Sequence, residues 1–176
     1  MAEIIANVKD KIRAVKDFPK PGIIFRDITT ALKEPDTLKE MIDYLCDQFK
    51  GTKIDYVAGI ESRGFIFGMP MAYKLNAGFV PIRKPNKLPA ATLSQEYELE
   101  YGTDKIEIHT DAIEEGANVL IVDDLLATGG TTEAAAKLIK KTGGNLIGIA
   151  FLIELEGLNG REKFDKDLKI VSMLKY

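Results

Sequence analysis

The stretch from Val119 to Thr132 holds the residues of this chain whose types and spacing best suit chemistry. It reads VLIVDDLLATGGTT, an apolar run followed by two acids, Asp123 and Asp124, and then by a small turn. The apolar run indicates a strand buried on both faces of a parallel sheet, and we expect the acids where that strand ends. Open α/β sheets bind ligands beyond the carboxyl ends of their strands, so both carboxylates should face a site.

The turn after the acids is suited to binding a phosphate. The turn consists of Ala127, Thr128, Gly129, Gly130 and Thr131, and a helical run follows it directly. Backbone N–H groups in a small turn and the positive end of a helix dipole both attract an anion. Acids beside a phosphate cradle would repel the ligand unless they bind hydroxyls or a metal, so the combination indicates a sugar phosphate. The stretch has neither the Gly-Lys-Ser/Thr of a Walker A loop nor a GxGxxG fingerprint.

This stretch resembles the phosphoribosyl pyrophosphate (PRPP) signature of the type I phosphoribosyltransferases, in the version DDLLATGGT that is typical of members acting on adenine. Nearly the whole chain resembles that family, with agreement in order and spacing at FPKPGIIFRDIT (18–29), GIESRGFIFG (59–68), IRKPNKLPAAT (82–92), YELEYG (97–102) and GREKF (160–164). The resemblance implies an α/β fold with a doubly wound, mostly parallel sheet flanked by helices. We expect one domain over 1–176, with an N-terminal helix and base-binding hood (1–35) and a flexible β-flap (83–110).

The resemblance also implies a reaction, the transfer of the 5-phosphoribosyl group from PRPP to adenine, which forms AMP and pyrophosphate in purine salvage. Mg²⁺ is the implied cofactor, bound through PRPP and water with no direct protein ligand. The transfer needs no covalent nucleophile, and the sequence shows no evident Ser-His or Cys-His pair. Charge developing on the ribose and on the leaving pyrophosphate must be stabilised. Family members are commonly dimeric, so a homodimer is expected.

Three cations are assigned to pyrophosphate by the resemblance: Arg63, Lys84 and Lys87. Arg63 lies in a polar loop after a strand expected at 54–60, and a guanidinium fork suits a phosphate group. Lys84 and Lys87 stand at the root of the flap. Family members often hold a non-prolyl cis peptide in the Arg63 loop, which would fall here between residues 61 and 62. The acids of the signature are assigned to the ribose.

By the same resemblance, the segment 23–27 forms a hood over the base. The backbone groups of Ile24 and Arg26 would read the base edge, while Phe25 and Leu125 would sandwich its faces. A backbone donor and acceptor at fixed separation distinguish a 6-amino from a 6-oxo purine, because the wrong base leaves a buried polar group unpaired.

The segment 84–102 predicts a flap. It starts as a long loop and ends in alternating apolar and acidic residues, which resume beyond Gly102 and indicate a β-hairpin that excludes water from the substrates. The resemblance gives catalytic roles to Glu100, which would exchange a proton with the purine, to its neighbour Tyr101, and to Arg63. The residues alone would not single out Glu100, because Glu96 and Glu98 share its face.

Helical periodicity is expected in two further places. Ile5, Val8, Ile12 and Val15 predict an amphipathic first helix. Asp36 or Thr37 can cap the next one, and Thr37 with Glu40 fits a capping box.

Strands are expected at 54–60, 79–83, 119–122, 145–155 and 168–174. His109, the only histidine, is expected at the surface.

Bulk properties narrow the class of protein. The chain has 176 residues, 45% of them hydrophobic, which suits one domain with a real core. A net charge of −3 and a pI near 5.3 argue against a nucleic-acid or anionic-membrane surface. The single Cys46 excludes an internal disulfide and fits a reducing compartment. No run approaches membrane-spanning length and the first twenty residues lack an apolar core, so a cytoplasmic location is expected.

Three alternatives stay open from the residues. Another base, such as hypoxanthine, xanthine or a pyrimidine, could be the acceptor, because base specificity lies in the hood and sequence pattern says little about it. A PRPP-sensing regulator without catalysis would keep the cradle, but no DNA-binding segment is visible. A phospho-receiver domain would use the acid pair, but it needs no glycine-rich cradle.

Overall fold

The structure is a computed structural model that describes residues 2–98 and 102–176. Contacts divide the chain into two compact units, Met1–Tyr44 and Leu45–Tyr176, called here the N-terminal and C-terminal units. The expectation of a single domain stays a prediction. Two of the expected catalytic residues, Glu100 and Tyr101, lie outside the described residues.

The N-terminal unit combines short helices with a two-stranded antiparallel hairpin. Its elements are α1 (Ala2–Lys11), β1 (Arg13–Lys16), β2 (Ile24–Asp27), α2 (Thr29–Leu32) and the first part of α3 (Pro35–Asp47). The expected first helix is correct as far as Val8, which is fully buried, but Val15 lies in β1 opposite Phe25. The predicted helix is wrong at Val15, because pairing with β2 holds β1 in an extended conformation.

Helix α3 begins earlier than the sequence suggested. Pro35 occupies its first turn, where a missing N–H costs nothing. Thr37 is therefore inside the helix and buried, and its hydroxyl bonds to the Glu34 carboxylate at 3.3 Å. The expected capping box of Thr37 with Glu40 was wrong. Met41 and Cys46 of this helix are both buried.

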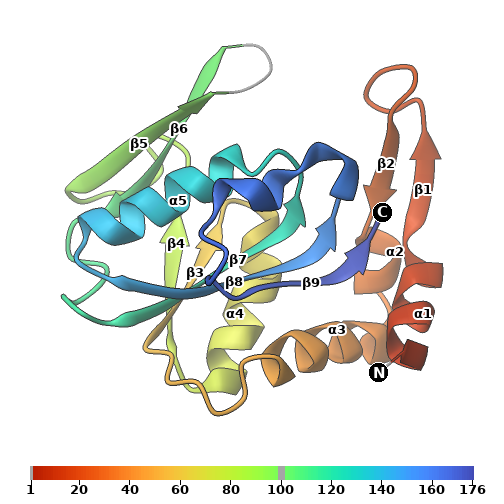
Figure 1. Cartoon of the computed structure of the whole chain (residues 1–176), viewed down its shortest axis with the longest axis horizontal. Coiled ribbons are helices and arrows are strands. Elements are labelled where there is room, and N and C mark those ends of the chain that lie inside the picture. Colours follow the sequence, from red (N-terminus) through yellow and green to blue (C-terminus); the bar gives the residue numbers. More distant parts are fainter. Residues whose placement is uncertain (1, 99–101) are drawn as a thin grey trace. The chain divides into compact units, whose positions relative to one another are not determined.

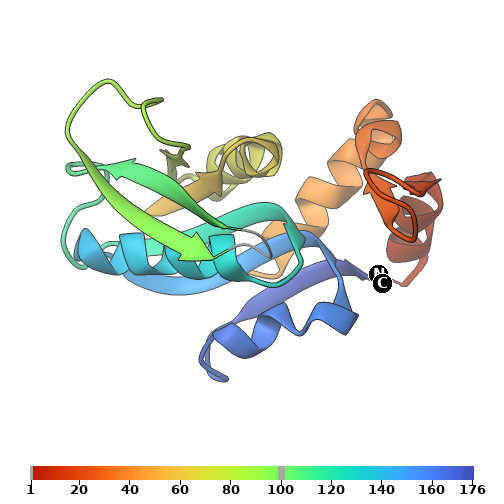
Figure 2. The same cartoon turned by 90° about the horizontal axis from the view of Figure 1, so that it is seen from above.

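The C-terminal unit is built on a five-stranded sheet in the order β4-β3-β7-β8-β9, with every neighbouring pair parallel. Its elements are β3 (Tyr56–Ile60), α4 (Arg63–Leu75), β4 (Gly78–Ile82), β5 (Thr92–Glu98), β6 (Thr103–His109), β7 (Asn118–Leu126), α5 (Gly130–Lys141), β8 (Asn145–Glu154), η1 (Glu156–Leu158), η2 (Gly160–Lys163) and β9 (Ile170–Lys175). Figures 1 and 2 together show α4 and α5 on opposite faces of this sheet. The doubly wound parallel sheet was predicted correctly.

The central strand β7 explains why its sequence is apolar for so long. Ile121 lies between Ala58 of β3 and Ile149 of β8, and all three side chains are fully buried. Helices on both faces leave no side of this strand to water. The strand runs to Leu126, further than expected, because β8 continues beside it and pairs Leu126 with Glu154. The acid pair therefore lies within β7, and the expectation that the strand stops before the acids was wrong.

The flap expected after β4 is a β-hairpin. Strands β5 and β6 pair antiparallel, with Tyr97 opposite Asp104 and Thr92 opposite His109, and the hairpin lies against α5 (Figure 1). His109 departs from the expectation of a surface residue. It is half-buried, and its Nε2 atom is enclosed without a hydrogen-bond partner in the described structure. No helix within residues 2–98 or 102–176 is long and apolar enough for a membrane crossing.

Candidate active site

The first turn of α4 packs directly on the end of β7. A Cβ atom at Gly64 would lie 2.6 Å from the carbonyl oxygen of Val122, so only glycine allows this approach. The close packing brings Arg63 beside the acid pair, with its Nε atom 3.0 Å from Oδ2 of Asp124. The peptide bond between Glu61 and Ser62 is cis, as the resemblance implied.

The acid pair is largely shielded from water, with Asp123 half-buried. Asp124 is 5% exposed, and Oδ1 of Asp123 accepts a hydrogen bond of 2.9 Å from the backbone N–H of Asp124. Burial raises the pKa of Asp123 well above its ordinary value, and the neighbouring Asp124 charge raises it further. Burial also raises the pKa of Asp124, although the Arg63 guanidinium opposes that rise. Hydroxyl donors or a cation would therefore favour the charged forms of both groups.

The turn between β7 and α5 has the geometry of an anion cradle. Gly129 adopts a left-handed conformation with φ of +80° and caps α5, which begins at Gly130. The first N–H groups of a helix have no acceptor within it and carry the positive end of its dipole. The residues expected to hold phosphate, 127–131, are thus brought together as one bend and the first helical residues.

Gly160 supports this cradle from behind. A Cβ atom at residue 160 would overlap the carbonyl oxygen of Ala127, and one at Gly129 would lie 2.6 Å from the carbonyl oxygen of Gly160. The start of η2 therefore fixes the position of the turn by backbone contact. Sequence reasoning noted GREKF only as part of the resemblance and assigned Gly160 no role.

Lys84 is engaged by the flap hairpin. Its Nζ atom donates to the Tyr97 hydroxyl at 2.8 Å and also pairs with the Asp104 carboxylate. Partial burial alone would lower the pKa of Lys84, but the hydrogen bonds to Asp104 and Tyr97 outweigh it and raise the pKa. Lys87 is exposed, and its carbonyl oxygen accepts a bond of 3.2 Å from Nη1 of Arg83.

The Glu61 side chain follows β3 and bonds to residues that follow β4. This contact was not predicted from the sequence. The Glu61 carboxylate accepts from Nε of Arg83 at 3.1 Å, from Nη2 of Arg83 at 3.3 Å and from the backbone N–H of Lys84 at 2.9 Å. A signal was available, because polar residues after neighbouring parallel strands meet at one edge of the sheet.

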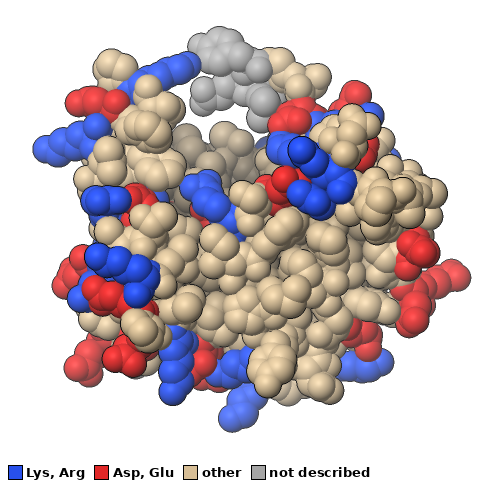
Figure 3. All heavy atoms as spheres, turned by 180° about the vertical axis from the view of Figure 1, so that it is seen from behind, with Lys and Arg blue, Asp and Glu red and all other residues tan. Residues whose placement is uncertain are grey.

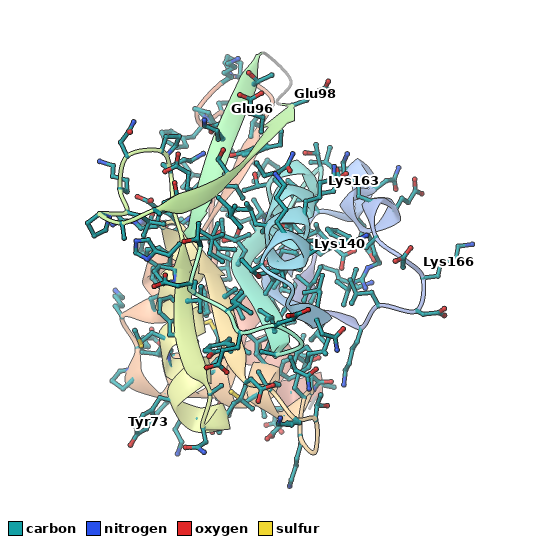
Figure 4. All side chains as sticks on the ribbon, turned by 90° about the vertical axis from the view of Figure 1, so that its left-hand side faces the viewer. Tyr73, Glu96, Glu98, Lys140, Lys163 and Lys166 are labelled. Atoms are coloured by element: carbon teal, nitrogen blue, oxygen red, sulfur yellow. The ribbon has the colours of Figure 1, made fainter. Side chains whose placement is uncertain are left out.

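A hollow of about 310 Å³ adjoins Gly130. It is lined by Glu96, Tyr97, Glu98, Gly130, Glu133, Ala134, Lys137 and Lys163. Figure 4 shows Glu96 and Glu98 on the hairpin and Lys163 on the neighbouring η2 segment. A larger hollow of about 540 Å³ lies between η2 and β9, lined by residues from Arg161 to Ile170, and holds none of the expected site residues. The smaller hollow belongs to the candidate site, because it contains Gly130 at the start of α5, where an anion can bind.

The expected base-binding residues come from two elements. Ile24, Phe25 and Arg26 form most of β2 in the N-terminal unit, where Ile24 is 48% exposed and Phe25 packs edge-to-face on Phe18 at 5.3 Å. Leu125 lies near the end of β7 and is half-buried. Their joint contact with a base stays a prediction.

Comparison with known proteins places this geometry in a family. The sequence model of the phosphoribosyl transferase domain matches residues 28–175. The chain belongs to the phosphoribosyltransferase family. A curated relative from Acaryochloris marina, named adenine phosphoribosyltransferase, is 58% identical over 97% of this chain and 99% of its own length. One of the same name from Alkaliphilus metalliredigens is also 58% identical, with the same coverage.

Solved structures of phosphoribosyltransferases share the fold. Adenine phosphoribosyltransferase from Thermoanaerobacter pseudethanolicus superposes with a TM-score of 0.94 at 53% identity, covering 98% of this chain and 99% of that one. The Saccharomyces cerevisiae enzyme, complexed with an imino-altritol bisphosphate and adenine, gives a TM-score of 0.93 at 39% identity, covering 99% and 100%. The parallel sheet with flanking helices is thus a type I phosphoribosyltransferase fold, as the sequence resemblance implied.

Proposed function

We propose that this chain transfers the 5-phosphoribosyl group from PRPP to adenine, forming AMP and pyrophosphate in purine salvage. The observation that carries the proposal is the order of groups along one strand and turn. Asp123 and Asp124 on β7 run directly into the cradle at 127–131, and Arg63 lies 3.0 Å from Asp124. Sugar, terminal phosphate and leaving group can therefore bind side by side. Relatives 58% identical over nearly the full length carry the name of this activity.

The ribose 5-phosphate half of PRPP fits β7 and α5. The backbone N–H groups of Ala127, Thr128, Gly129, Gly130 and Thr131 would surround the 5′-phosphate. Asp123 and Asp124 would accept hydrogen bonds from the two ribose hydroxyls, which would stabilise their charged forms against the effect of burial. Fixed contacts on both sides of the sugar would hold its anomeric carbon in place for attack.

The pyrophosphate half fits the cations at the ends of β3 and β4. Arg63 would exchange part of its contact with Asp124 for the phosphate oxygens, and its planar fork suits such a group. Lys84 would exchange part of its ion pair with Asp104 for phosphate oxygens. Lys87 is exposed to solvent. Together they would take up the negative charge that develops on the leaving group.

Mg²⁺ fits this arrangement as a partner of the substrate. It prefers phosphate oxygens and water, with at most one or two carboxylates. Asp124 is already paired with Arg63 at 3.0 Å, so we assign the ion to the substrate oxygens and water. When bound, the ion would supply positive charge to the pyrophosphate oxygens, while Asp123 and Asp124 hold the ribose beside it.

The acceptor side rests on the hood and the flap. Ile24, Phe25, Arg26 and Leu125 are proposed to contact adenine, and the yeast relative was solved with adenine bound. Glu100 is proposed to exchange a proton with the base, with Tyr101 beside it on the flap. Closure of the hairpin would exclude water during transfer.

An assay with four bases tests the proposed function. PRPP and Mg²⁺ are incubated with adenine, hypoxanthine, xanthine or uracil, and the nucleotide formed is measured. We expect AMP with turnover far above that of any other base. Preference for another base would replace the acceptor while keeping the reaction class. PRPP binding without turnover on any base would favour the sensing regulator.

We further propose that the chain forms a homodimer through α4. Three apolar side chains repeat along one side of that helix, Ile66 (41% exposed), Met69 (54%) and Tyr73 (89%). Tyr73 projects away from the sheet (Figure 4), and uncharged atoms fill most of the lower centre of the face that Figure 3 views. Such a patch is unusual on a monomer, and a second copy would bury it symmetrically.

Light scattering tests the dimer. The wild type should have about twice the chain mass of 19.5 kDa. Tyr73→Glu should shift it toward the monomer, whereas the matched surface change Lys166→Glu should not. A wild-type monomer would disprove the dimer.

A cytoplasmic location is also proposed, because a chain with one cysteine, Cys46, forms no internal disulfide and the phosphorylated substrates do not cross membranes. Cell fractionation would test it.

A further inference from the structure

The proposed pyrophosphate ligands come from two separate segments, one after β3 and one after β4. We infer that Glu61 and Arg83 are positioning residues that hold these two segments in a single arrangement around the leaving group. The inference rests on the proposed function, because it takes Arg63, Lys84 and Lys87 as pyrophosphate ligands.

The link between the segments is a guanidinium-carboxylate fork. Nε and Nη2 of Arg83 donate to the two carboxylate oxygens of Glu61 at 3.1 and 3.3 Å. Glu61 side-chain exposure is 18% and Arg83 side-chain exposure is 32%, so the pair is partly shielded from water. A two-point contact of this kind fixes orientation as well as distance, unlike most surface ion pairs.

Each end of the fork is tied to a proposed ligand. On the first segment, Glu61 precedes Arg63 by two residues, and its backbone N–H bonds to the carbonyl oxygen of Ile82 at 2.9 Å. On the second segment, the Glu61 carboxylate accepts from the backbone N–H of Lys84 at 2.9 Å, and Nη1 of Arg83 donates to the carbonyl oxygen of Lys87 at 3.2 Å. One carboxylate and one guanidinium therefore contact the backbone of Lys84 and Lys87, and the third proposed cation, Arg63, follows Glu61 by two residues in the chain.

Strand β6 holds the second segment from the other side. Arg83 and Glu107 exchange both backbone hydrogen bonds, at 2.9 and 2.7 Å, and the Glu107 carboxylate accepts from the N–H of Asn86 at 3.2 Å. The Arg83 backbone is thus anchored while its side chain reaches across to Glu61. The anchored backbone of Arg83 therefore lets its side chain hold Glu61 and, through it, the start of α4 at Arg63.

Charge supports a positioning role for Arg83 over a role as a fourth phosphate ligand. Its Nε, Nη1 and Nη2 atoms each have a partner within the chain. Burial alone would raise the pKa of Glu61, but the bonds from Arg83 and from the Lys84 N–H outweigh it and lower the pKa. Glu61 is therefore charged at neutral pH and neutralises Arg83, which leaves Arg63, Lys84 and Lys87 to meet pyrophosphate.

The test compares ligands with and without pyrophosphate. Glu61→Gln keeps the shape and one acceptor but loses the charge, and Arg83→Lys keeps the charge but loses the fork. Since a charged hydrogen bond is worth one to two factors of ten, each should raise the KM for PRPP and the inhibition constant of pyrophosphate by about tenfold. AMP, which carries no pyrophosphate, should bind within about twofold of wild type. The double variant should be no weaker than either single one, because both break the same link.

Glu156→Gln serves as the control, because Glu156 forms an exposed ion pair with Lys175 at 2.9 Å, outside the proposed site. It should leave every constant unchanged. Thermal unfolding of each variant separates misfolding from local effects. If AMP and pyrophosphate weaken equally, if the two single losses simply add, or if both single variants match wild type, the positioning role is wrong while the proposed function stands. A wild-type protein that binds neither PRPP nor pyrophosphate would overturn both.

Discussion

Arg63 and Asp124 form an ion pair of 3.0 Å between the first turn of α4 and the central strand β7. One is the proposed ligand of pyrophosphate and the other of ribose, so the two halves of PRPP meet at this contact. Gly64 makes the contact possible by letting the helix approach the strand. The pair keeps a buried carboxylate compensated until a substrate supplies hydroxyl donors on one side and phosphate on the other.

Replacing Asp123 by Asn should weaken PRPP binding and raise the stability of the folded chain. The variant keeps the oxygen that accepts from the Asp124 N–H but removes a charge that burial and Asp124 both disfavour. We expect stability to rise by on the order of 1 kcal/mol, or about 2–4 °C in Tm for a chain of this length. Calorimetry should show weaker PRPP binding. Unchanged PRPP affinity would exclude the proposed contact of Asp123 with ribose, and the exposed Asp111→Asn is a matched control.

The same variant predicts a pH dependence. The pKa of Asp123 is raised in the folded chain above its ordinary value of 3.8, so the folded state holds more protons than the unfolded state between those two values. Stability from this group therefore falls as pH rises through the raised pKa and is recovered as pH drops toward 3.8. The Tm advantage of Asp123→Asn over wild type should be largest at neutral pH and shrink in acid. An advantage that grows in acid would show that the sign is wrong.

Gly160→Ala should damage the phosphate cradle without touching the ligand. Its Cβ would overlap the carbonyl oxygen of Ala127, so the turn must move. Overpacking of this kind costs about 1–3 kcal/mol, and PRPP affinity should fall by about tenfold. Gly157→Ala is the matched control in the same segment, because a Cβ there meets nothing within 4 Å. Equal effects of the two substitutions on PRPP binding would disprove the support role of Gly160.

Glu100→Gln should lower turnover by about a hundredfold while leaving PRPP binding largely intact, because a general acid or base acts in the chemical step. Glu114→Gln, at an exposed glutamate outside the proposed site, is the matched control and should have little effect on turnover. Rapid-quench kinetics and PRPP calorimetry measure the two quantities separately. Loss of PRPP affinity equal to the loss of rate would refute the assigned role of Glu100.

The parallel core of the fold was predictable because its signals are local. Val119–Val122 is apolar on both faces and sits between two further buried strands, as its sequence indicated. Boundaries that depend on a distant partner were not predictable. Val15 carries helical spacing but pairs with Phe25, and β7 extends to Leu126 because β8 continues alongside it.

The candidate site divides in the same way. The acid pair and the cradle are consecutive in sequence, so their proximity followed from a strand, a bend and a helix in order. Gly160 and the Glu61–Arg83 fork depend on backbone and side-chain contacts between segments far apart in the chain. Pattern alone gave Glu61 no role, and only the neighbouring positions of β3 and β4 in the sheet bring it to Arg83.

The most direct measurement is a crystal structure with AMP bound. We predict phosphate density within hydrogen-bond distance of the backbone N–H groups at 127–131 and ribose hydroxyls against Asp123 and Asp124. Phosphate held elsewhere, or a ribose that contacts neither carboxylate, would contradict the central claim that β7 and the start of α5 form the phosphoribosyl site.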